Sequence, residues 1–508
     1  MPLLSWFNRD ADLTRAALAP YRLLEPVASL SHGDPDAPNM LIEGDNLDAL
    51  KALLPYYAGQ VKCIFIDPPY NTRTDFEHYD DNLEHSQWLS MIYPRLELLR
   101  ALLRQDGVIF ATIDDTEAHY MKVVMDEVFG RRNFVANIVW QKKYTVANDA
   151  KWFSSTHDHV LVYAGDKDKW FPKRLARPAE MDARYKNPDK HKKGPWKATP
   201  IHAKSGSAAG ASFKYRFKNG VVWSPPPGTF SRYSAATLAA MDENDEIWFG
   251  KNGEAMPSRK TFLSDISEGG VVSSTLWLHS EVGHNHEARD EAKAAVPEDA
   301  FKTPKPERLI QRVLELSTGP GDLVLDSFLG SGTTAAVAHK MGRRWIGVEM
   351  GDHARTHCVP RLKKVVAGDQ GGVSQSVGWP EVGGGGFRFF KLGAPVFDDS
   401  GHIREDIRFE HLAAHVWFSE TGTPRSSRAK KEAFLGEHDG KAYYLLFNGV
   451  LGDLSKDGGN VLTKKILRSL PAFNGPKVIY GEACAFSEDQ CSELEIEFKQ
   501  TPYDIKAR

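Results

Sequence analysis

Apolar and polar residues follow one another in blocks that predict two regions of alternating strand and helix, separated by a long irregular region. Short apolar runs bounded by polar residues predict buried strands, and apolar residues three or four positions apart predict helices. The first region is predicted to contain, in order, strand 40–46, helix 47–54, strand 61–66, helix 86–104, strand 108–113, helix 117–129 and strand 133–140, with one further strand at 159–163.

The same alternation resumes at Pro306. Strands that alternate with helices predict βαβ units and a largely parallel sheet, so the expected fold class is α/β with a mostly parallel, twisted sheet. The elements predicted here are helix 307–317, strand 322–326, strand 344–349 and helix 353–366.

The segments outside these regions differ in composition. From Asp166 to about Ala300 the chain is rich in Pro, Gly, Lys and aromatic residues, and a segment that long inside an α/β core predicts a separate functional module. A stretch rich in Gly, Ser and Gln predicts a linker. The expected parts are an N-terminal extension (1–39), the first α/β part (40–140), an inserted region (141–300), the second α/β part (301–366), a linker (367–386) and a small C-terminal α+β domain (387–508).

Composition narrows the class of protein. The 508 residues carry a net charge of −3, and no apolar run approaches the ~18 residues that a membrane span needs. The N-terminal segment lacks the apolar core of a signal peptide. The cysteines are scattered without a CxxC pair, which argues against a disulfide framework or a zinc ribbon and predicts a cytoplasmic protein. They are Cys63, Cys358, Cys484 and Cys491.

Positive charge is concentrated in one region. Between residues 141 and 220 there are 18 Lys and Arg against 7 Asp and Glu, with aromatic residues interspersed. This mixture suits contacts with phosphates and bases of nucleic acid, although a solvated basic face would look the same. The candidate DNA-binding residues are Lys142, Lys143, Lys151, Lys173, Arg174, Lys192 and Lys193.

The sequence Asp67-Pro68-Pro69-Tyr70 stands at the end of a predicted strand, where ligands of α/β sheets bind. Asp67 can accept a hydrogen bond from an amino group, and Tyr70 can stack on a planar base. The two prolines hold the backbone rigid and leave the Pro68 carbonyl as a further acceptor. Taken alone, the segment could also be a Pro-rich turn.

A second motif, Gly330-Ser331-Gly332, follows a predicted strand and precedes a predicted helix. Glycines let the backbone approach a ligand closely, and a helix N-terminus offers free N–H groups. Glu349 ends the next strand, where an acid that holds ribose hydroxyls belongs. By itself the loop also satisfies a relaxed dinucleotide pattern, so NAD binding stays open, whereas the absence of a following Lys excludes a P-loop.

These motifs resemble those of the amino-group DNA methyltransferases. Asp67 to Tyr70 is similar to the catalytic motif of that family, and Phe328 to Thr333 is similar to its cofactor motif. The order, with the catalytic motif first and the cofactor loop last, resembles the β group. Residues 44–50 and 387–508 also resemble modification subunits of type III restriction systems. The resemblance implies a Rossmann-like methyltransferase fold and S-adenosyl-L-methionine as cofactor.

The resemblance also implies roles for individual residues. The catalytic residues would be Asp67, Pro68, Pro69 and Tyr70. Thr303 or Lys305 would meet the cofactor carboxylate, the glycine loop its methionine part, Glu349 its ribose, and Asp45 and Asn46 its adenine. The full set of expected cofactor-binding residues is Asp45, Asn46, Asp67, Thr303, Lys305, Asp326, Phe328, Gly330, Ser331, Gly332, Thr333, Thr334 and Glu349.

The implied reaction is site-specific methylation of adenine N6 in double-stranded DNA after base flipping, within restriction-modification or phage defence. Asp at position 67 favours adenine, and cytosine N4 is the alternative. A NAD-dependent oxidoreductase and a non-catalytic DNA-binding subunit are rivals from other classes. Besides DNA, the family suggests a homodimer and a restriction subunit as partners, in a bacterial cytoplasm and encoded by the bacterium or a phage.

Two weaker signals remain. His279, His284 and His286 cluster in sequence, but amino methylation needs no metal and their spacing fits no standard site, so a loop returning to the core is expected and no metal. Asp114-Asp115 is expected to cap the helix that begins near Glu117.

Overall fold

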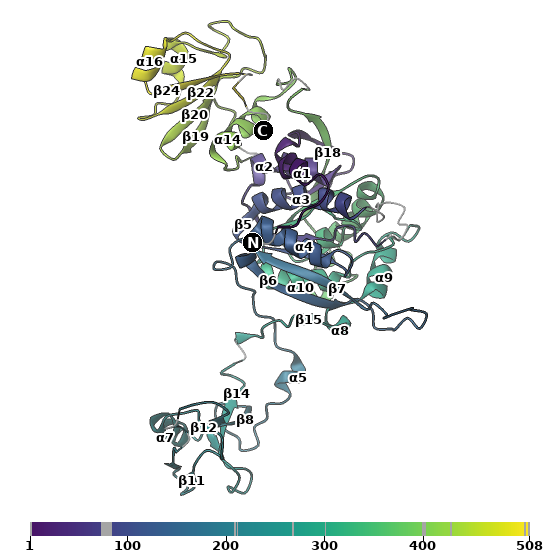
Figure 1. Cartoon of the computed structure of the whole chain (residues 1–508), viewed down its shortest axis with the longest axis vertical. Helices are drawn as coiled ribbons and strands as arrows, with labels where there is room; N and C mark the ends of the chain where they lie inside the picture. The colour runs from purple at the N-terminus through teal and green to yellow at the C-terminus, as the bar shows by residue number, and fades with distance from the viewer. Residues whose placement is uncertain are drawn as a thin grey trace. The chain divides into compact units, whose positions relative to one another are not determined.

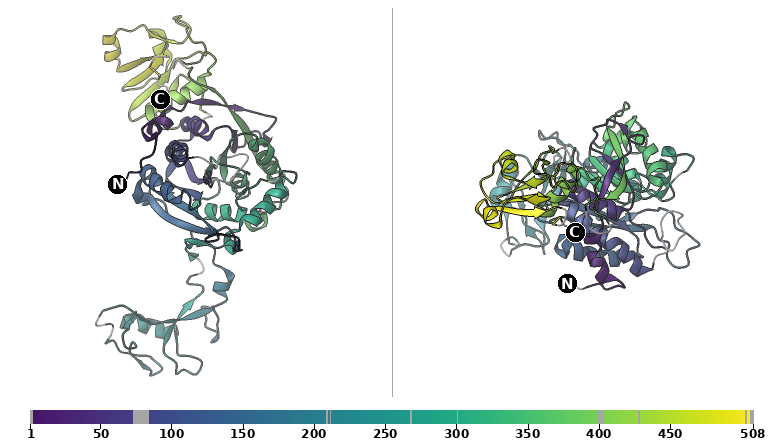
Figure 2. Two further views of the ribbon diagram at one scale, coloured as in Figure 1. Left: turned by 45° about the vertical axis from the view of Figure 1, so that its right-hand side comes forward. Right: turned by 90° about the horizontal axis from the view of Figure 1, so that it is seen from above.

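The computed structural model describes residues 3–72, 84–207, 210, 212–266, 269–299, 301–398, 403–426, 429–501 and 504–505 (Figures 1 and 2). The chain divides into two compact units, one formed by Met1–Phe171 with Ser274–Arg508 and the other by Pro172–Ser273. Each unit has its own core, so each is described by itself.

The first unit is built on a mixed sheet of eleven strands, ordered β1-β18-β3-β17-β16-β4-β5-β7-β6-β15, with β2 beside β18. The run from β18 to β5 is parallel throughout, which confirms the predicted α/β class with a mostly parallel sheet. The strands are β1 Arg22–Pro26, β2 His32–Gly33, β3 Met40–Glu43, β4 Val61–Ile66, β5 Leu103–Ile113, β6 Phe134–Gln141, β7 His157–Ala164, β15 Leu276–Trp277, β16 Leu323–Asp326, β17 Arg344–Glu349 and β18 Gly386–Pro395.

Helices cover both faces of this sheet (Figure 2). Alternate residues of a strand point to opposite faces, so Ile64 and Ile66 of β4 join one core with α2 and α3, whereas Phe65 points to the other side. The helices of this unit that precede β18 are α1 Arg9–Leu18, α2 Asn46–Tyr57, α3 His85–Leu102, α4 Ala118–Met125, α8 His279–Val282, α9 Asn285–Ala295, α10 Glu307–Ser317, α11 Thr333–Lys340, α12 Val359–Val366 and α13 Ser374–Val377.

One side of the sheet reverses direction. β7 pairs antiparallel with β5, so that Ile113 at the end of β5 faces His159 near the start of β7. β7 is also antiparallel to β6, which is parallel to β15. The start of β7 therefore lies at the same edge as the carboxyl ends of the parallel strands.

The observed boundaries differ from the expected domain limits. The compact second unit, Pro172–Ser273, is narrower than the expected insertion at 141–300, because β7, β15, α8 and α9 belong to the first unit. Likewise β18 (Gly386–Pro395), expected at the start of a separate C-terminal domain, pairs in parallel with β3. Phe387 and Phe389 of β18 are fully buried, so this strand is part of the main core.

Residues after β18 form a smaller sheet with the order β19-β20-β22-β24, in which only the β19–β20 pair is antiparallel. A separate pair, β21-β23, lies in the same segment. The elements are α14 Phe409–Thr421, β19 Phe434–His438, β20 Lys441–Leu445, β21 Val461–Leu462, α15 Lys464–Ser469, β22 Lys477–Gly481, β23 Ala483–Cys484, α16 Glu488–Glu493 and β24 Ile496–Gln500.

The second unit is made of short strands around a small apolar core. Phe217, Trp223, Leu238 and Ile247 are among its buried residues. A three-stranded sheet, β13-β14-β8, and two strand pairs, β10-β11 and β12-β9, surround this core. The elements are α5 Ala179–Asp182, β8 Trp196–Pro200, β9 His202–Ala203, β10 Tyr215–Arg216, β11 Val222–Trp223, β12 Phe230–Ser231, α7 Ala235–Glu243, β13 Ile247–Trp248 and β14 Ser258–Phe262.

Several predicted elements need correction. The helix expected at 117–129 ends as α4 at Met125 and continues as a π-helical turn, Asp126–Gly130, and the helix expected at 353–366 begins with a π-helical turn, Ala354–Cys358. The loop expected around His279 and His286 is instead two short helices, α8 and α9. In the described part of the chain no helix is both long and apolar enough to cross a membrane.

Candidate active site at the carboxyl edge of the sheet

A cavity of about 390 Å³ lies where β4, β5 and β16 end, and it unites the two motifs singled out in the sequence. Asp67 and Tyr70 come from the turn after β4, whereas Phe328 and Gly330 come from the loop after β16. Parallel strands bring their carboxyl ends to one edge, which is why segments 260 residues apart meet here. The expected site residues that line it are Asp67, Pro68, Pro69, Tyr70, Lys142, Lys143, Thr303, Lys305, Phe328 and Gly330.

The Asp67 carboxylate is held by two partners. The Thr112 hydroxyl on β5 donates to its Oδ1 at 2.5 Å, and the Lys305 ammonium forms an ion pair with its Oδ2. The Lys305 ammonium also lies 5.1 Å from the centre of the Tyr70 ring. Lys305 therefore connects the segment before α10 to both ends of the Asp67–Tyr70 turn.

The Asp67–Tyr70 turn is also held in place by a residue of α3. The indole N–H of Trp88 donates to the Pro69 carbonyl at 2.8 Å, and Trp88 is fully buried. Neither proline can donate a main-chain hydrogen bond. The hydrogen bond from Trp88 therefore stabilises a turn whose prolines lack that capacity.

Tyr70 belongs to a polar group that the sequence did not reveal. Its hydroxyl donates to Asp158 on β7 at 3.4 Å, and Lys142 forms an ion pair with the same carboxylate at 2.5 Å. Burial, together with the neighbouring Asp158 and Asp67 carboxylates, raises the pKa of Tyr70 well above its usual value. Burial also raises the pKa of Asp158 to about 6, against the opposing effect of Lys142.

The glycine loop after β16 has the conformation that its sequence requires. Gly330 and Gly332 both have positive φ, of 56° and 81°, which side chains rarely tolerate. A Cβ on Gly330 would also come within 3.3 Å of the Phe301 ring. Glu349, at the end of β17, accepts the Gly330 N–H at 2.6 Å and so fixes the loop.

A buried ionic group supports the same loop from α10 and α12. Glu307 pairs with Arg361 at 2.8 Å and with Lys340 at 2.9 Å, and all three side chains are at most 5% exposed. Arg361 in turn donates to the Thr333 hydroxyl at 2.8 Å, next to the Ser331 hydroxyl. The glycine loop is thus anchored to a charged cluster rather than to apolar packing alone.

Asp326, the last residue of β16, is buried beneath the loop. Its carboxylate accepts the Phe328 N–H at 2.9 Å and a hydrogen bond from Thr334. Burial raises its pKa to about 7, although both hydrogen bonds act in the opposite direction. The Ser327 hydroxyl beside it is buried and has no hydrogen-bond partner within the described ranges.

Asp45 and Asn46 do not line the cavity. Asp45 caps α2 by accepting the Leu47 N–H at 2.7 Å and pairs with Arg95 at 3.0 Å. Asn46 donates to the Ser327 carbonyl at 2.8 Å, so this pair lies beside the strand end that carries the glycine loop.

The candidate DNA-binding residues fall into two groups. Lys142 and Lys143 line the cavity in the first unit, and the Lys151 ammonium lies 5.3 Å from the centre of the exposed Trp152 ring. The other four, Lys173, Arg174, Lys192 and Lys193, belong to the second unit. Of these, Lys193 forms an ion pair with Glu246 at 2.5 Å.

The expected capping by Asp114-Asp115 is wrong. The N-cap of α4 is Glu117, without a side-chain capping bond, and Asp114 instead accepts the Thr116 N–H at 2.9 Å within the preceding turn. The Asp115 carboxylate turns to His159, 2.9 Å away on β7. Strand pairing between β5 and β7 offers Asp115 this partner, and a local capping rule cannot anticipate it.

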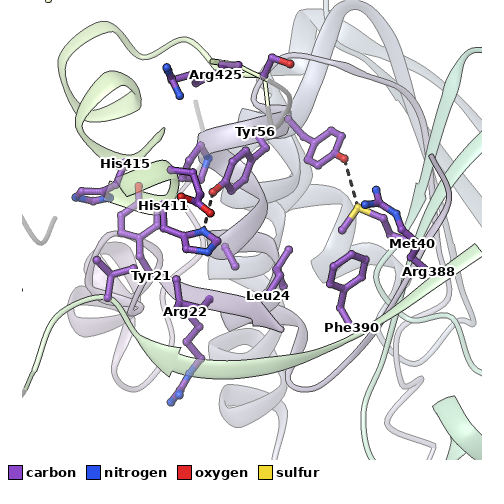
Figure 3. A pocket seen from close by; sticks show the side chains of 18 residues that line it. Tyr21, Arg22, Leu24, Met40, Tyr56, Arg388, Phe390, His411, His415 and Arg425 are labelled. Carbon is purple, nitrogen blue, oxygen red and sulfur yellow. Dashed lines mark hydrogen bonds between the residues drawn. The ribbon is translucent and has the colours of Figure 1, made fainter. Parts of the chain in front are cut away.

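A second cavity, of about 170 Å³, lies between α2, β1, β18 and α14 (Figure 3). Tyr56 and His411 meet there at 3.3 Å, and the Tyr57 hydroxyl donates to the Met40 sulfur at 3.3 Å. None of the expected catalytic or cofactor residues lines it, so the chemistry of the two motifs belongs to the first cavity.

Both motifs lie within a match to a known protein family. The family model N6_N4_Mtase, described as DNA methylase, matches residues 61–358. The StyLTI Mod subunit of a type III restriction-modification enzyme from Salmonella typhimurium is 32% identical, over 58% of this chain and 49% of its own length. The type II methyltransferase M.EcaI from Enterobacter cloacae is also 32% identical, over 61% of this chain and 66% of its own length.

Solved structures also match this chain, but at lower sequence identity than the curated relatives. The cytosine-N4-specific PvuII DNA methyltransferase is 14% identical and covers 68% of this chain and 94% of its own, with a TM-score of 0.36. M1.HpyAVI is also 14% identical, over 64% of this chain and 98% of its own, with a TM-score of 0.32. The chain spans about half to two thirds of the length of the curated relatives named above.

Proposed function

The chain belongs to the N6_N4_Mtase family of DNA methylases, and on that premise we propose that it transfers a methyl group from S-adenosyl-L-methionine to the N6 amino group of adenine in duplex DNA. Membership of a DNA methylase family confirms the prediction from the motifs. The observation that supports this proposal most directly is that Asp67 to Tyr70 and the glycine loop line one cavity, although they lie more than 250 residues apart.

The loop region suits a cofactor with an amino-acid end and a nucleoside end. Gly330 and Gly332 keep the backbone open to close approach, and α11 begins at Thr333 without a side-chain cap, which leaves N–H groups for polar ligand atoms. Thr303 and Lys305 line the cavity, so they would hold the carboxylate. Glu349 would hold the ribose hydroxyls.

The remaining expected cofactor residues lie around this loop. Asp45 and Asn46 are tied to the segment after β16 and would lie near the adenine ring. Asp326, Ser331, Thr333 and Thr334 would set the shape of the loop rather than line the cavity. When bound, S-adenosyl-L-methionine supplies a sulfonium methyl group, which passes to the amino nitrogen as that nitrogen loses a proton.

The catalytic turn would hold a flipped base. Tyr70 would stack on the base, and Asp67 with the Pro68 carbonyl would accept hydrogen bonds from its amino group. Lys305 and Thr112 each occupy one oxygen of Asp67, so the ion pair with Lys305 competes with a base amino group for this carboxylate. A cofactor carboxylate beside Thr303 would offer Lys305 another anionic partner, so cofactor binding would prepare Asp67 for the base.

The second unit would contact DNA outside the cavity. Its Lys and Arg residues suit phosphates, and we propose that Pro172–Ser273 reads the recognition sequence. Because relatives of this chain are named Mod subunits of type III restriction-modification enzymes, a restriction subunit and a second copy of the chain are the protein partners proposed for a bacterial cytoplasm.

The test is incorporation of labelled methyl groups into DNA, followed by digestion and identification of the modified nucleoside. We expect N6-methyladenine from the wild type and at least a thousandfold lower rate from Asp67→Ala, with cofactor binding within a few-fold of wild type by calorimetry. Asp457→Asn, which removes an exposed carboxylate far along the chain, is the matched control and should keep full activity.

The outcomes separate the alternatives. N4-methylcytosine as the product would replace adenine by cytosine as substrate and keep the rest of the proposal. An active Asp67→Ala protein would refute the role of the catalytic turn. Binding of NAD with no binding of S-adenosyl-L-methionine would refute the methyltransferase assignment of the cavity.

A further inference from the structure

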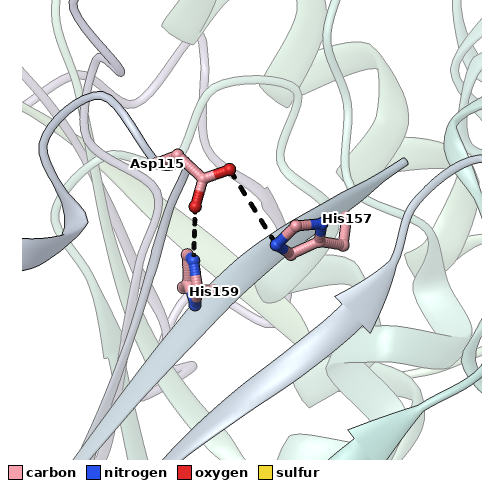
Figure 4. Close-up of side chains that lie close together, drawn as sticks. All are labelled: Asp115, His157 and His159. Atoms are coloured by element: carbon pink, nitrogen blue, oxygen red, sulfur yellow. Dashed lines mark hydrogen bonds and ion pairs between the residues drawn. The ribbon is translucent and has the colours of Figure 1, made fainter. Parts of the chain in front are cut away.

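Asp115, His157 and His159 form a compact group of ligating side chains outside the cavity (Figure 4). Asp115 follows the end of β5, and the two histidines are alternate residues of β7, so they share one face of that strand. His159 Nε2 lies 2.9 Å from Asp115 Oδ1, and His157 Nε2 lies 3.9 Å from Asp115 Oδ2. The three ligand atoms are all within 4.8 Å of one another.

We propose that Asp115, His157 and His159 bind a divalent transition-metal ion such as Zn²⁺, which joins the end of β5 to the start of β7. Two imidazoles and one carboxylate are a donor set that Zn²⁺ and its neighbours in the transition series prefer. Water would complete the coordination, because Asp115 and His157 are partly open to solvent.

The spacing of the group suits such an ion. Ligands bound at about 2.0–2.1 Å in a tetrahedron are about 3.3 Å apart. His159 lies 2.9 Å from one Asp115 oxygen and His157 lies 3.9 Å from the other, and the three ligand atoms lie within 4.8 Å, so the group has to tighten to hold an ion. The Asp115 side chain is 63% exposed and that of His157 36%, so both can rotate by the small amount required. His159, at 11%, is the fixed member of the group.

His159 is oriented as metal-binding histidines usually are. Its second ring nitrogen, Nδ1, lies 3.1 Å from the Asn137 side-chain oxygen on β6. A ring that donates Nδ1–H to this oxygen presents the lone pair of Nε2 towards Asp115, and an outer contact of this kind commonly fixes the tautomer of a metal ligand. In the other neutral tautomer Nε2–H would donate to Asp115, so the 2.9 Å separation accommodates either a proton or a metal ion between these two atoms.

An ion bound by these three residues would also affect the cavity, because Asp158 of the same strand lines it. Asp158 lies between the two histidines on β7 and points to the opposite face, where it meets Tyr70 and Lys142. An ion that fixes the start of β7 therefore also fixes the strand position that carries Asp158. Binding of the ion by Asp115, His157 and His159 does not depend on which reaction the cavity performs.

The test uses the full-length chain, stripped with a chelator and titrated with Co²⁺ and then Zn²⁺. We expect one Co²⁺ per chain, with the visible absorption bands of a low-coordinate site, and displacement of Co²⁺ by Zn²⁺. Zn²⁺ should also raise the thermal midpoint of the wild type, since a ligand that binds only the folded state stabilises it.

Asp115→Asn and His157→Ala should each weaken Co²⁺ binding at least tenfold, and His157→Gln provides a second variant of similar volume. His286→Ala, which removes an exposed histidine on α9, is the control and should bind as the wild type does. Folding of each variant is verified by its circular dichroism and its metal-free thermal midpoint.

Absence of stoichiometric Co²⁺ binding by the wild type would overturn the proposal. Asp115, His157 and His159 would then be a group of side chains joined only by hydrogen bonds. Equal binding by the wild type and a folded Asp115→Asn, His157→Ala double variant would also overturn it, because the ion would then occupy another site.

Discussion

Replacing Glu307 by Gln should destabilise the first unit by about 3–5 kcal/mol. Among the ion pairs of the described residues, Glu307 is the only carboxylate that lies within 3 Å of both Arg361 and Lys340. Its carboxylate also accepts the Val373 N–H at 3.1 Å. Gln keeps the shape of the side chain but removes its charge. Two cations that are at most 5% exposed would then lack their principal counter-charge.

The magnitude follows from the burial of the group. Breaking a buried ion pair by removing one partner typically costs 3–5 kcal/mol, because the charge left behind is neither solvated nor paired. The upper end applies here if both cations stay charged. The lower end applies if water reaches Lys340, which also lies 3.8 Å from the partly exposed Asp369.

The effect should depend on pH with a definite sign. Burial by itself would raise the pKa of Glu307, but Arg361 and Lys340 outweigh burial and lower the pKa below its ordinary 4.5. An acid whose pKa is lowered by folding stabilises the fold above its unfolded value, and this contribution disappears as the pH falls through the folded value. The difference between wild type and Glu307→Gln should therefore be largest near pH 7 and shrink below pH 4.5.

Urea denaturation at pH 7 and pH 4, followed by circular dichroism, measures this difference from the transition midpoint and slope. Glu432→Gln is the matched control, since its ion pair with Lys430 is exposed, at 54% and 85% for the two side chains, and such pairs contribute at most about 1 kcal/mol. A loss of stability in Glu307→Gln no larger than that of the control would show that the buried ion pairs of Glu307 do not stabilise the fold.

Three further predictions concern the cavity. Asp326→Asn should become more stable relative to the wild type as the pH rises from 3.8 to 7, by up to about 4 kcal/mol, because burial raises the folded-state pKa of Asp326 to about 7 and the wild type loses stability over this range; a difference that does not change with pH by urea denaturation would contradict this. Gly330→Ala should weaken binding of S-adenosyl-L-methionine at least tenfold by calorimetry, since its new Cβ approaches Phe301, whereas Gly342→Ala, also at positive φ but with open space, should affect only stability. Trp88→Phe should cost about 1–3 kcal/mol in thermal unfolding by leaving a carbonyl of the catalytic turn without its donor, and an unchanged midpoint would show that the contact is dispensable.

The sequence predicts the interior of the sheet well. Strands such as β4 and β16 are short apolar runs that are buried on both faces, so their apolar character alone identifies them. The amphipathic helix α10 coincides with its predicted range, 307–317. Irregular turns are different, since the apolar pattern at 353–366 predicts one continuous helix and does not distinguish the π-helical turn Ala354–Cys358 from α12.

The candidate site is predicted in part. Asp67 to Tyr70 and the glycine loop are visible in the sequence because each contains residue types that few other roles require, and the structure places both at one cavity. Asp158 and its contacts with Tyr70 and Lys142 are not visible, because they depend on the antiparallel pairing of β7 with β5. For the same reason, the pairing of Asp115 with His159 has no local signal in the sequence.

The position of β18 sets a limit on how the chain can be divided. β18 pairs with β3 on one side and with β1 and β2 on the other, so it closes an edge of the main sheet that would otherwise be open. A shortened chain that ends at the glycine-rich segment before residue 386 would retain both motifs but expose the main-chain N–H and C=O groups of β3. Such unpaired strand edges promote aggregation, so a stable catalytic fragment should extend at least to Pro395.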